Sequence, residues 1–239
     1  EVGEGVAIYP THNLHMLLFA ASYDGQGAVA MRAGRDYTVL SGDVMHQALT
    51  LIRFGRFDEI AELGPRPRGE VGAAVWDFAQ GYAALRNGDP GTARAHQERV
   101  AEIAETTTAK YRFHPAGHVL GPLAYILDGE IHRAAGDLDD AVASFENAVA
   151  REDEMGYDEP EPLPFSARHW LGAALIEAGR FEEAATVYRD ELSDHPHNGW
   201  SLYGLQQALA GSGVSDSAVD EDLAQSWARA DTWIRASRF

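Results

Sequence analysis

The chain has no cysteine, a single lysine and no long hydrophobic run. Without cysteine it can form neither a disulfide nor a thiolate nucleophile or metal ligand. The longest mainly apolar stretch, residues 14–21, is far shorter than the roughly 20 residues that a membrane-spanning helix needs. No signal peptide is visible, but the chain begins at Glu1, so we expect sequence upstream of it to be missing. We expect a cytoplasmic protein.

Positive charge is also scarce. Lysine and arginine total 19 against 37 aspartate and glutamate residues, so the formal net charge is -18. An acidic surface repels phosphate backbones and anionic lipids, which argues against nucleic acid and against membrane as partners. It suits cationic ligands or metal ions instead. No Gly-x-Ser-x-Gly, phosphate-binding glycine loop or His-Glu-x-x-His motif occurs, so no particular enzyme class is indicated.

The chain does contain a repeated pattern, in which a glycine is followed five residues later by Ala or Ile. A glycine ends one helix and turns the chain, and a small residue lets the next helix pack closely against the first. The spacings between copies are 30, 33, 48 and 43 residues, near the roughly 34 of a tetratricopeptide helix–turn–helix unit. The Ala and Ile positions are Ala30, Ile60, Ala93, Ala141 and Ala184.

This repeat predicts the fold class. We expect an all-α chain, a tetratricopeptide-like helical-hairpin solenoid of about five to six repeats, forming one domain over residues 1–239. Residues 222–237 are expected to form a C-terminal capping helix. No stretch has the pattern of a convincing strand. The alternative is an irregular helical bundle in which the glycine–alanine spacing recurs by chance. It is disfavoured because the same spacing occurs five times.

Two intervals are longer than one repeat, and the excess falls in residues 106–122 and 156–165. Each segment contains proline and glycine, which rule out simple continuation of a helix. Insertions in a solenoid usually emerge on one face, often the binding face. We therefore expect these two segments to form neighbouring loops.

Four stretches also carry a resemblance to known proteins. They are YPTHNLHMLLFAAS, IRFGRFDEI, GYDEPEP leading into LGAALIEAGRFEEAATVYRDEL, and HPHNGWSLYGLQQAL. With them the chain resembles, over nearly its whole length, a set of bacterial tetratricopeptide-repeat proteins of largely unassigned function. Relatives carry additional helical repeats upstream, which implies that this chain corresponds to their C-terminal portion. The resemblance implies no agreed activity, and Glu161-Pro162-Leu163 replaces the aromatic residues more common after Glu-Pro in relatives.

Three histidines could form a metal site. In a tetratricopeptide unit the first helix lines the groove, and the register turns His12 and His15 inward on one helical face. His46 lies in the first helix of the next unit. The metal would be a divalent transition metal (Cu, Fe, Zn or Mn), although metal sites usually need three or four donors. The alternatives stay open: a helix cap or solvated residue for His12, a hydrogen-bonded core residue for His15, and a structural role for His46.

Other polar residues are candidates for binding a ligand in the groove. Some are turned inward by the repeat register, and others belong to the acidic segment 152–162, which is either a solvated loop or a lid over the groove. An arginine close to that lid would bind a carboxylate. These candidates are Glu130, Arg133, Tyr157, Glu159, Arg168 and His169.

Two classes of function fit these observations. The first is a binding scaffold whose concave groove holds a peptide, a partner protein or a small ligand, and an acidic groove would prefer basic or amphipathic partners. The second is a metal-dependent, histidine-ligated enzyme or a small-molecule-binding protein with its site in the groove. We favour the scaffold, because the ligand set for a metal is incomplete.

Overall fold

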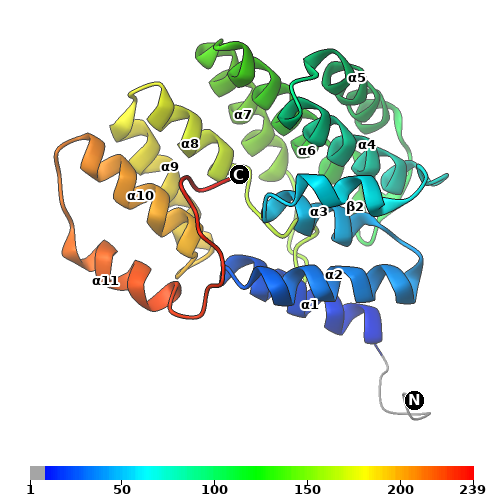
Figure 1. Cartoon of the computed structure of the whole chain (residues 1–239), viewed down its shortest axis with the longest axis horizontal. Helices are drawn as coiled ribbons and strands as arrows, with labels where there is room; N and C mark the ends of the chain where they lie inside the picture. The colour runs from blue at the N-terminus through cyan, green and yellow to red at the C-terminus, as the bar shows by residue number, and fades with distance from the viewer. Residues whose placement is uncertain (1–8) are drawn as a thin grey trace.

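The structure, a computed structural model, describes residues 9–239, and its helices pair as neighbours along the chain (Figure 1). The first six helices are α1 (Pro10–Tyr23), α2 (Gly27–Ser41), α3 (Met45–Arg53), the 3-10 helix η1 (Phe57–Leu63), α4 (Glu70–Arg86) and α5 (Pro90–Thr106). After them come β1 (Lys110–Tyr111), β2 (His114–Pro115), α6 (Ala116–Ala135), α7 (Leu138–Glu152), α8 (Arg168–Glu177), α9 (Phe181–Asp194), α10 (Gly199–Gly211) and α11 (Ser217–Ser226). Six successive hairpins, from α1–α2 to α10–α11, confirm the predicted all-α solenoid.

A glycine with a left-handed backbone turns each hairpin. The φ angle lies between +66° and +90° at Gly25, Gly55, Gly88, Gly136, Gly179 and Gly213. Glycine adopts this conformation at little cost because it has no Cβ. The five Ala and Ile residues predicted to begin the second helices are all fully buried. In the sixth hairpin the residue five positions after the glycine, Ala218, is exposed, which explains why the sequence pattern fades there.

The first insertion is shorter than predicted. Residues 107–115 separate α5 from α6 and contain the two short strands, whereas residues 116–122, expected in a loop, belong to α6. Pro122 lies within the second turn of this helix, where it removes one backbone hydrogen bond without ending the helix. Strands of two residues are too short to leave an alternating pattern. The second insertion is non-helical over residues 156–165, as predicted.

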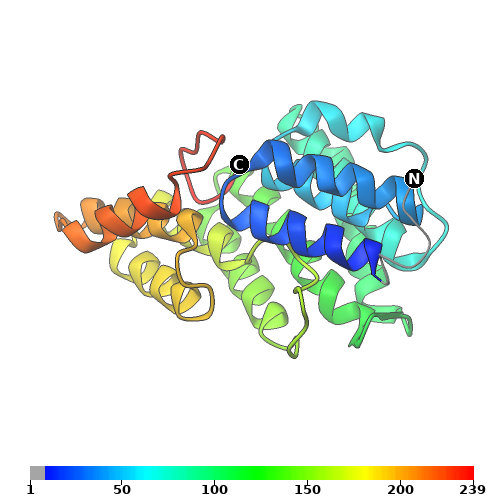
Figure 2. The ribbon, with the colours of Figure 1, turned by 90° about the horizontal axis from the view of Figure 1, so that it is seen from below.

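A C-terminal helix, α11, is present, but the bounds predicted for it, residues 222–237, are wrong. α11 begins earlier, where Asp216 accepts a hydrogen bond from the Ala218 amide at 3.0 Å, and it ends at Ser226. Residues 227–239 then turn back and lie between α11 and the α1–α2 hairpin (Figure 2). The two tryptophans of this segment have different environments. Trp227 packs against Gly199, which has no side chain to obstruct it, and Trp233 is 95 % exposed.

The last hairpin returns to the first, so the solenoid closes on itself (Figure 1). Trp200 of α10 is fully buried, and its indole N–H donates to the Ser22 carbonyl of α1 at 2.9 Å. The guanidinium of Arg53, at the end of α3, lies 3.7 Å from the centre of the Trp200 ring. Four elements, α1, α2, α3 and α10, therefore share one side-chain cluster, although α10 is far from the others in sequence.

Side chains fill the inside of this closed arc. Trp170 of α8 is buried, and its indole N–H donates to the Tyr82 hydroxyl of α4 at 3.0 Å. Tyr82 in turn donates to the backbone oxygen of Phe239 at 3.0 Å. The Tyr188 hydroxyl lies 2.7 Å from the Ser237 hydroxyl. The chain's own last residues thus occupy the space in which the sequence suggested an open concave groove.

Closure predicts a large effect of Trp200→Ala on stability. The substitution removes a buried aromatic side chain, its hydrogen bond to α1 and its stacking on Arg53. We expect the free energy of unfolding to fall by about 3–5 kcal/mol in urea denaturation. The matched control is Trp233→Ala, which removes an exposed tryptophan and should change stability by less than about 0.5 kcal/mol. Equal stabilities of the two variants would show that closure through Trp200 contributes little.

Candidate functional site

The two insertions contact each other, as predicted. Arg112, in the turn between β1 and β2, donates to the backbone oxygens of Glu159 and Pro160 at 2.8 and 2.9 Å. The same guanidinium pairs with the buried Asp158 carboxylate at 2.8 Å. His114 of β2 lies 3.3 Å from the second oxygen of Asp158. One arginine thus holds the second insertion against the first.

His15 and His46 form a buried pair beneath this junction. Their rings lie 3.9 Å apart between centroids, and both side chains are shielded from solvent. The Tyr111 hydroxyl lies 3.0 Å from His46 Nε2, and an Arg112 nitrogen lies 3.4 Å from His15 Nδ1. Burial, and then the charge of Arg112, lower the pKa of His15 to about 4. Burial also lowers the pKa of His46, so both rings are neutral at pH 7.

The metal prediction lacks a third ligand. His12 is half-buried on the first turn of α1, and its ring lies edge-on to Tyr9 at 6.2 Å. Within residues 9–239 no group of three or more His, Asp or Glu side chains is placed to hold a metal ion. Of the three predicted ligands, the structure brings together only His15 and His46. One buried ring nitrogen of each, His15 Nε2 and His46 Nδ1, has no hydrogen-bond partner in the described part of the chain.

Glu130 and Arg133, predicted to bind a ligand, lie inside the closed arc. Glu130 is fully buried and pairs with Arg133 at 2.9 Å and with Arg238 at 3.2 Å. Arg133 also reaches Glu177 at 3.5 Å. Burial alone would lower the pKa of Arg133, but the neighbouring carboxylates of Glu130 and Glu177 raise it above its usual value, so Arg133 stays charged.

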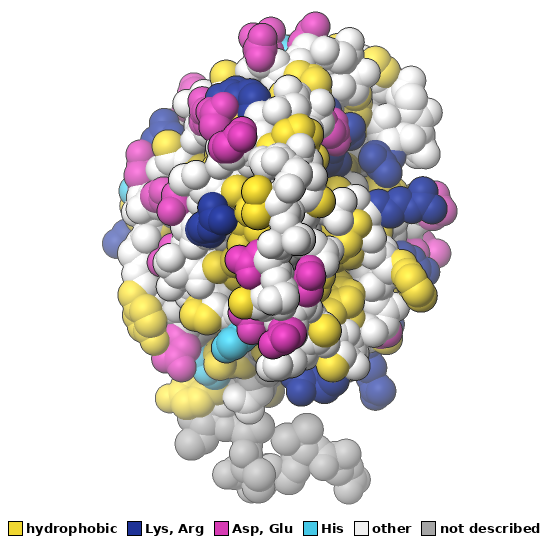
Figure 3. Space-filling model, turned by 90° about the vertical axis from the view of Figure 1, so that its left-hand side faces the viewer, with side chains coloured by type: hydrophobic (Ala, Val, Ile, Leu, Met, Phe, Trp, Pro, Cys, Tyr) yellow, Lys and Arg dark blue, Asp and Glu magenta, His cyan; other side chains and the backbone are white. Residues whose placement is uncertain are grey.

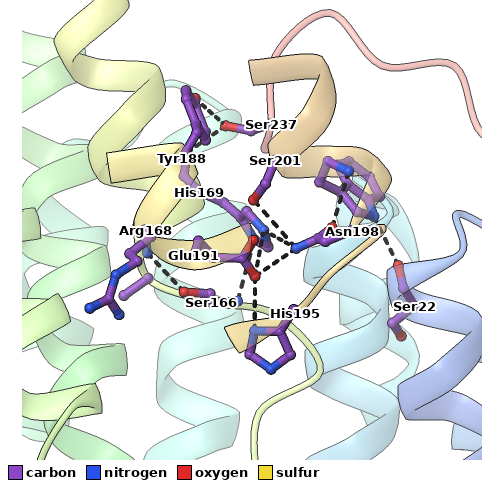
Figure 4. Close-up of polar contacts among 12 residues, drawn as sticks. Ser22, Ser166, Arg168, His169, Tyr188, Glu191, His195, Asn198, Ser201 and Ser237 are labelled. Carbon is purple, nitrogen blue, oxygen red and sulfur yellow. Dashed lines mark hydrogen bonds and ion pairs between the residues drawn. The ribbon is translucent and has the colours of Figure 1, made fainter. Parts of the chain in front are cut away.

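His169 belongs to the same interior and not to the surface (Figure 4). Its Nδ1 lies 3.1 Å from the Arg53 guanidinium, and the Ser166 amide donates to it at 3.3 Å. The side-chain amide of Asn198 lies 2.9 Å from His169 Nε2 and donates to Glu191 at 2.7 Å. Burial, and then the nearby charge of Arg53, lower the pKa of His169 well below its usual value. The ring is a neutral part of the core that joins α8 to the start of α10.

The remaining predicted residues, Tyr157, Glu159 and Arg168, lie on or beside the second insertion. Tyr157 is 86 % exposed and its hydroxyl donates to the Glu159 carboxylate at 3.0 Å. Arg168 forms a bidentate pair with Asp153 at 2.8 and 2.9 Å. Tyr157 and Arg168, but not Glu159, line a pocket of about 760 Å³ between the insertion and the end of α9. Arg168 is thus already paired with a carboxylate of this protein.

The pocket is strongly acidic. Its lining includes Glu152, Asp153, Glu161 and Asp194, against the two cationic side chains of Arg168 and His195. Both cations are engaged, Arg168 with Asp153 and His195 with Glu161 at 3.2 Å. The lining therefore carries an excess of negative charge that the protein itself does not neutralise.

Glu152 is the unusual carboxyl group of this pocket. It ends α7 and is 14 % exposed. It accepts hydrogen bonds from the Ser166 hydroxyl at 2.9 Å and the Ala167 amide at 3.0 Å. Burial raises the pKa of Glu152 to about 7, and these hydrogen bonds only partly oppose that effect. The charge of the pocket therefore changes near neutral pH.

His195 connects this pocket to a second, more apolar one. The second pocket has a volume of about 500 Å³ and is lined partly by Leu17, Phe19 and Val29 of the first hairpin. Burial alone would lower the pKa of His195, but hydrogen bonds to Glu161 and Glu191 raise it to about 10. His195 is therefore an imidazolium at pH 7, and its stabilising effect is complete below pH 6.5 and lost as pH rises through about 10. The two pockets together form a surface that is acidic on one side and apolar on the other; we call it the seam.

Several of these residues were missed as site residues by sequence reasoning. Glu152 lies within the acidic run and has no feature that distinguishes it from its exposed neighbours. Arg53 resembles any arginine at a helix end. Glu191 and His195 are spaced i, i+4, which would have indicated a side-chain pair on one helical face. Their burial against α1 depends on closure and has no local signal.

A family model described as tetratricopeptide repeat matches residues 128–199, from within α6 to the start of α10. A search of curated proteins finds no match. Together with the six hairpins, the family match shows that this is a tetratricopeptide-repeat-containing protein. In the described residues 9–239, no helix is long and apolar enough to cross a membrane. Repeats of this kind generally bind peptides or proteins.

The raised pKa of Glu152 predicts a pH-dependent stability. The unfolded carboxyl ionises near pH 4.5 and the folded one near pH 7. The contribution of Glu152 is therefore fully present below pH 4.5 and is lost as pH rises through 7. The glutamine of Glu152→Gln cannot ionise. The free energy of unfolding of this variant, relative to that of the unmodified chain, should therefore rise by about 3 kcal/mol between pH 4 and pH 8. Urea denaturation at several pH values measures the difference.

The control for this prediction is Glu154→Gln. Glu154 lies two residues away with its side chain 44 % exposed, so this variant removes one carboxyl charge without removing a buried carboxyl. A stability difference between Glu152→Gln and the unmodified chain that stays constant from pH 4 to pH 8 would contradict the raised pKa of Glu152.

Proposed function

We propose that this protein is a binding scaffold that holds a basic, amphipathic peptide segment of a partner at the seam. The carrying observation is the pairing of two pockets on either side of His195. Four carboxyl groups belong to the lining of one pocket, and the other is lined mainly by apolar side chains, together with the ion pair of Asp24 and Arg229. A segment with Lys or Arg at one end and Leu or aromatic residues at the other would match both. The closed arc supports this location because its interior holds the chain's own side chains.

Charge complementarity favours such a partner. The chain has a formal net charge of -18, which attracts cationic segments over a distance set by the ionic strength. Figure 3 shows acidic side chains lying beside hydrophobic patches on the side of the molecule at the left of Figure 1. At the seam, acidic and apolar side chains lie next to each other in two adjoining pockets. The second insertion, held by Arg112, forms one wall of the acidic pocket.

We expect a fluorescent peptide Lys-Arg-Leu-Leu-Lys-Leu-Leu to bind the protein, with an affinity that falls as salt concentration rises. The double variant Glu161→Gln, Asp194→Asn should weaken binding about three- to tenfold, because it removes two charges from the acidic pocket. Phe19→Ala should also weaken binding, because it removes an apolar side chain from the lining of the second pocket. Fluorescence anisotropy measures each dissociation constant.

The matched control changes two exposed acidic residues of α7 outside both pockets, Asp139→Asn and Glu146→Gln. It alters the net charge equally and should leave binding almost unchanged. Binding should also strengthen as pH rises through about 7, because Glu152 becomes ionised. Equal weakening by both double variants would show that the peptide responds to net charge alone, and the seam would lose its role.

A second candidate function is transition-metal binding by His15 and His46, favoured by their two unpartnered ring nitrogens. It predicts that protein prepared without a histidine tag carries Cu, Fe, Zn or Mn in a stoichiometric amount. His15→Ala and His46→Ala should each lose this metal, and His12→Ala should show whether the half-buried third histidine takes part. His132→Ala, which changes a partly exposed histidine on α6, should retain it. If elemental analysis finds no metal in the unmodified chain, this candidate function is eliminated.

A further inference from the structure

The last residues of the chain are held by a recess built for a guanidinium group. Arg238 is 7 % exposed, and its Nε forms an ion pair with Glu130 at 3.2 Å, without hydrogen-bond geometry. Another guanidinium nitrogen lies 2.7 Å from a Glu177 oxygen. Glu130 is on α6 and Glu177 ends α8, so one side chain bridges the first helices of two neighbouring hairpins. A planar group with several fixed donors suits two separate carboxylates better than an ammonium does.

The recess requires a cation. Glu130 and Glu177 carry two negative charges, and Arg133 supplies one positive charge to both. Arg238 supplies the second. Because Glu130 is fully buried, the loss of one cation leaves negative charge in a site that water cannot stabilise well. An unoccupied recess would therefore take up a replacement cation of similar shape.

The contacts on either side of Arg238 are made mostly with backbone or with a small hydroxyl group. The Ser237 hydroxyl donates to the His169 carbonyl at 2.6 Å, and the Ser237 carbonyl lies 3.4 Å from the Arg53 guanidinium. The Phe239 backbone oxygen accepts from Tyr82, and the Phe239 ring packs on Trp200 with centroids 5.8 Å apart. Any extended segment with a small residue, an arginine and an aromatic residue could make this set of contacts.

We propose that the recess between α6 and α8 is an arginine-binding site for extended peptide segments, which residues 237–239 occupy in the closed protein. A peptide with the sequence small residue–Arg–aromatic exchanges with this internal segment and takes its place. The preceding residues allow such an exchange, since Trp233 is almost fully exposed and Arg235 is exposed. This site is distinct from the seam, so either proposal can fail while the other stands.

Chemical rescue of Arg238→Ala tests the recess directly. This variant removes the guanidinium and should lower the melting temperature. Millimolar n-propylguanidinium should then raise it in a saturable manner, whereas n-propylammonium should raise it much less. The unmodified chain and the control variant Arg235→Ala, which removes an exposed arginine of the same segment, should show no rise. The absence of rescue, or an equal effect of propylguanidinium on all three proteins, would overturn the proposal.

Exchange is tested by a labelled peptide that copies residues 233–239, Trp-Ile-Arg-Ala-Ser-Arg-Phe. It should bind Arg238→Ala at least tenfold more tightly than the unmodified chain or Arg235→Ala, because the weakened internal segment competes less. A peptide with Lys in place of its second Arg should bind at least tenfold more weakly. Equal affinity for all three proteins, or equal affinity of the two peptides, would contradict exchange at this recess.

A measurement on the unmodified chain covers the case in which Arg238→Ala does not fold. Excess unlabelled peptide should accelerate amide hydrogen exchange in residues 233–239, which are displaced, and leave exchange in α6 and α8 unchanged. Unaltered exchange in residues 233–239 at saturating peptide would show that Arg238 is a permanent structural ion pair and that the recess does not accept a ligand.

Discussion

The contact on which the remaining structure depends is the return of α10 to the first hairpins through Trp200. An open solenoid leaves the inner face of its helices in water, but here the indole of Trp200 joins the Ser22 carbonyl to the Arg53 guanidinium. Closure places polar side chains from distant segments in a space from which water is excluded. Burial consequently lowers the pKa of Arg53 to about 9 and keeps His169 neutral. The Ser166 amide donates to His169, and one Arg53 nitrogen lies near the Ser237 carbonyl. Arg53 Nε and its other terminal nitrogen have no hydrogen-bond partner among the described residues, and the guanidinium lies over the Trp200 ring.

Closure also decides which concave surfaces of the solenoid are open to solvent. The inner face of the solenoid is covered by the protein's own side chains, and one accessible concave surface lies where α9 and the second insertion meet α1. His195 occupies the centre of that surface, stacked on Tyr23 with ring centroids 4.8 Å apart and paired with Glu161 and Glu191. The two insertions, joined by Arg112, cover the His15–His46 pair and shape the acidic pocket. A structural constraint on the fold thus produces both the occupied interior and the exposed seam.

The sequence predicted the hairpins well and their ends less well. Glycine followed by a small residue is a local requirement of the turn and of close helix packing, and all five predicted Ala and Ile positions are buried. Two boundaries were wrong. Residues 106–122 were expected to form a loop, but α6 begins at Ala116, and residues 222–237 were expected to form a helix, but α11 ends at Ser226. In the second case burial of Ser237 and Arg238 inside the arc outweighs local helical preference.

For the candidate site, the sequence alone indicated most inward-facing residues and that the two insertions are neighbours, because both follow from helical period and repeat length. His12, also predicted to face inward, is half-buried beside Tyr9. His15, Glu130 and His169 are inward and buried for that reason. Only the tertiary structure decided that these residues contact the protein's own chain, since the contacts come from Arg112, Arg238 and Asn198, which are remote in sequence. The charge, the pKa and the solvent exposure of each site residue depend on such distant neighbours. No local sequence pattern encodes the closure that brings them together.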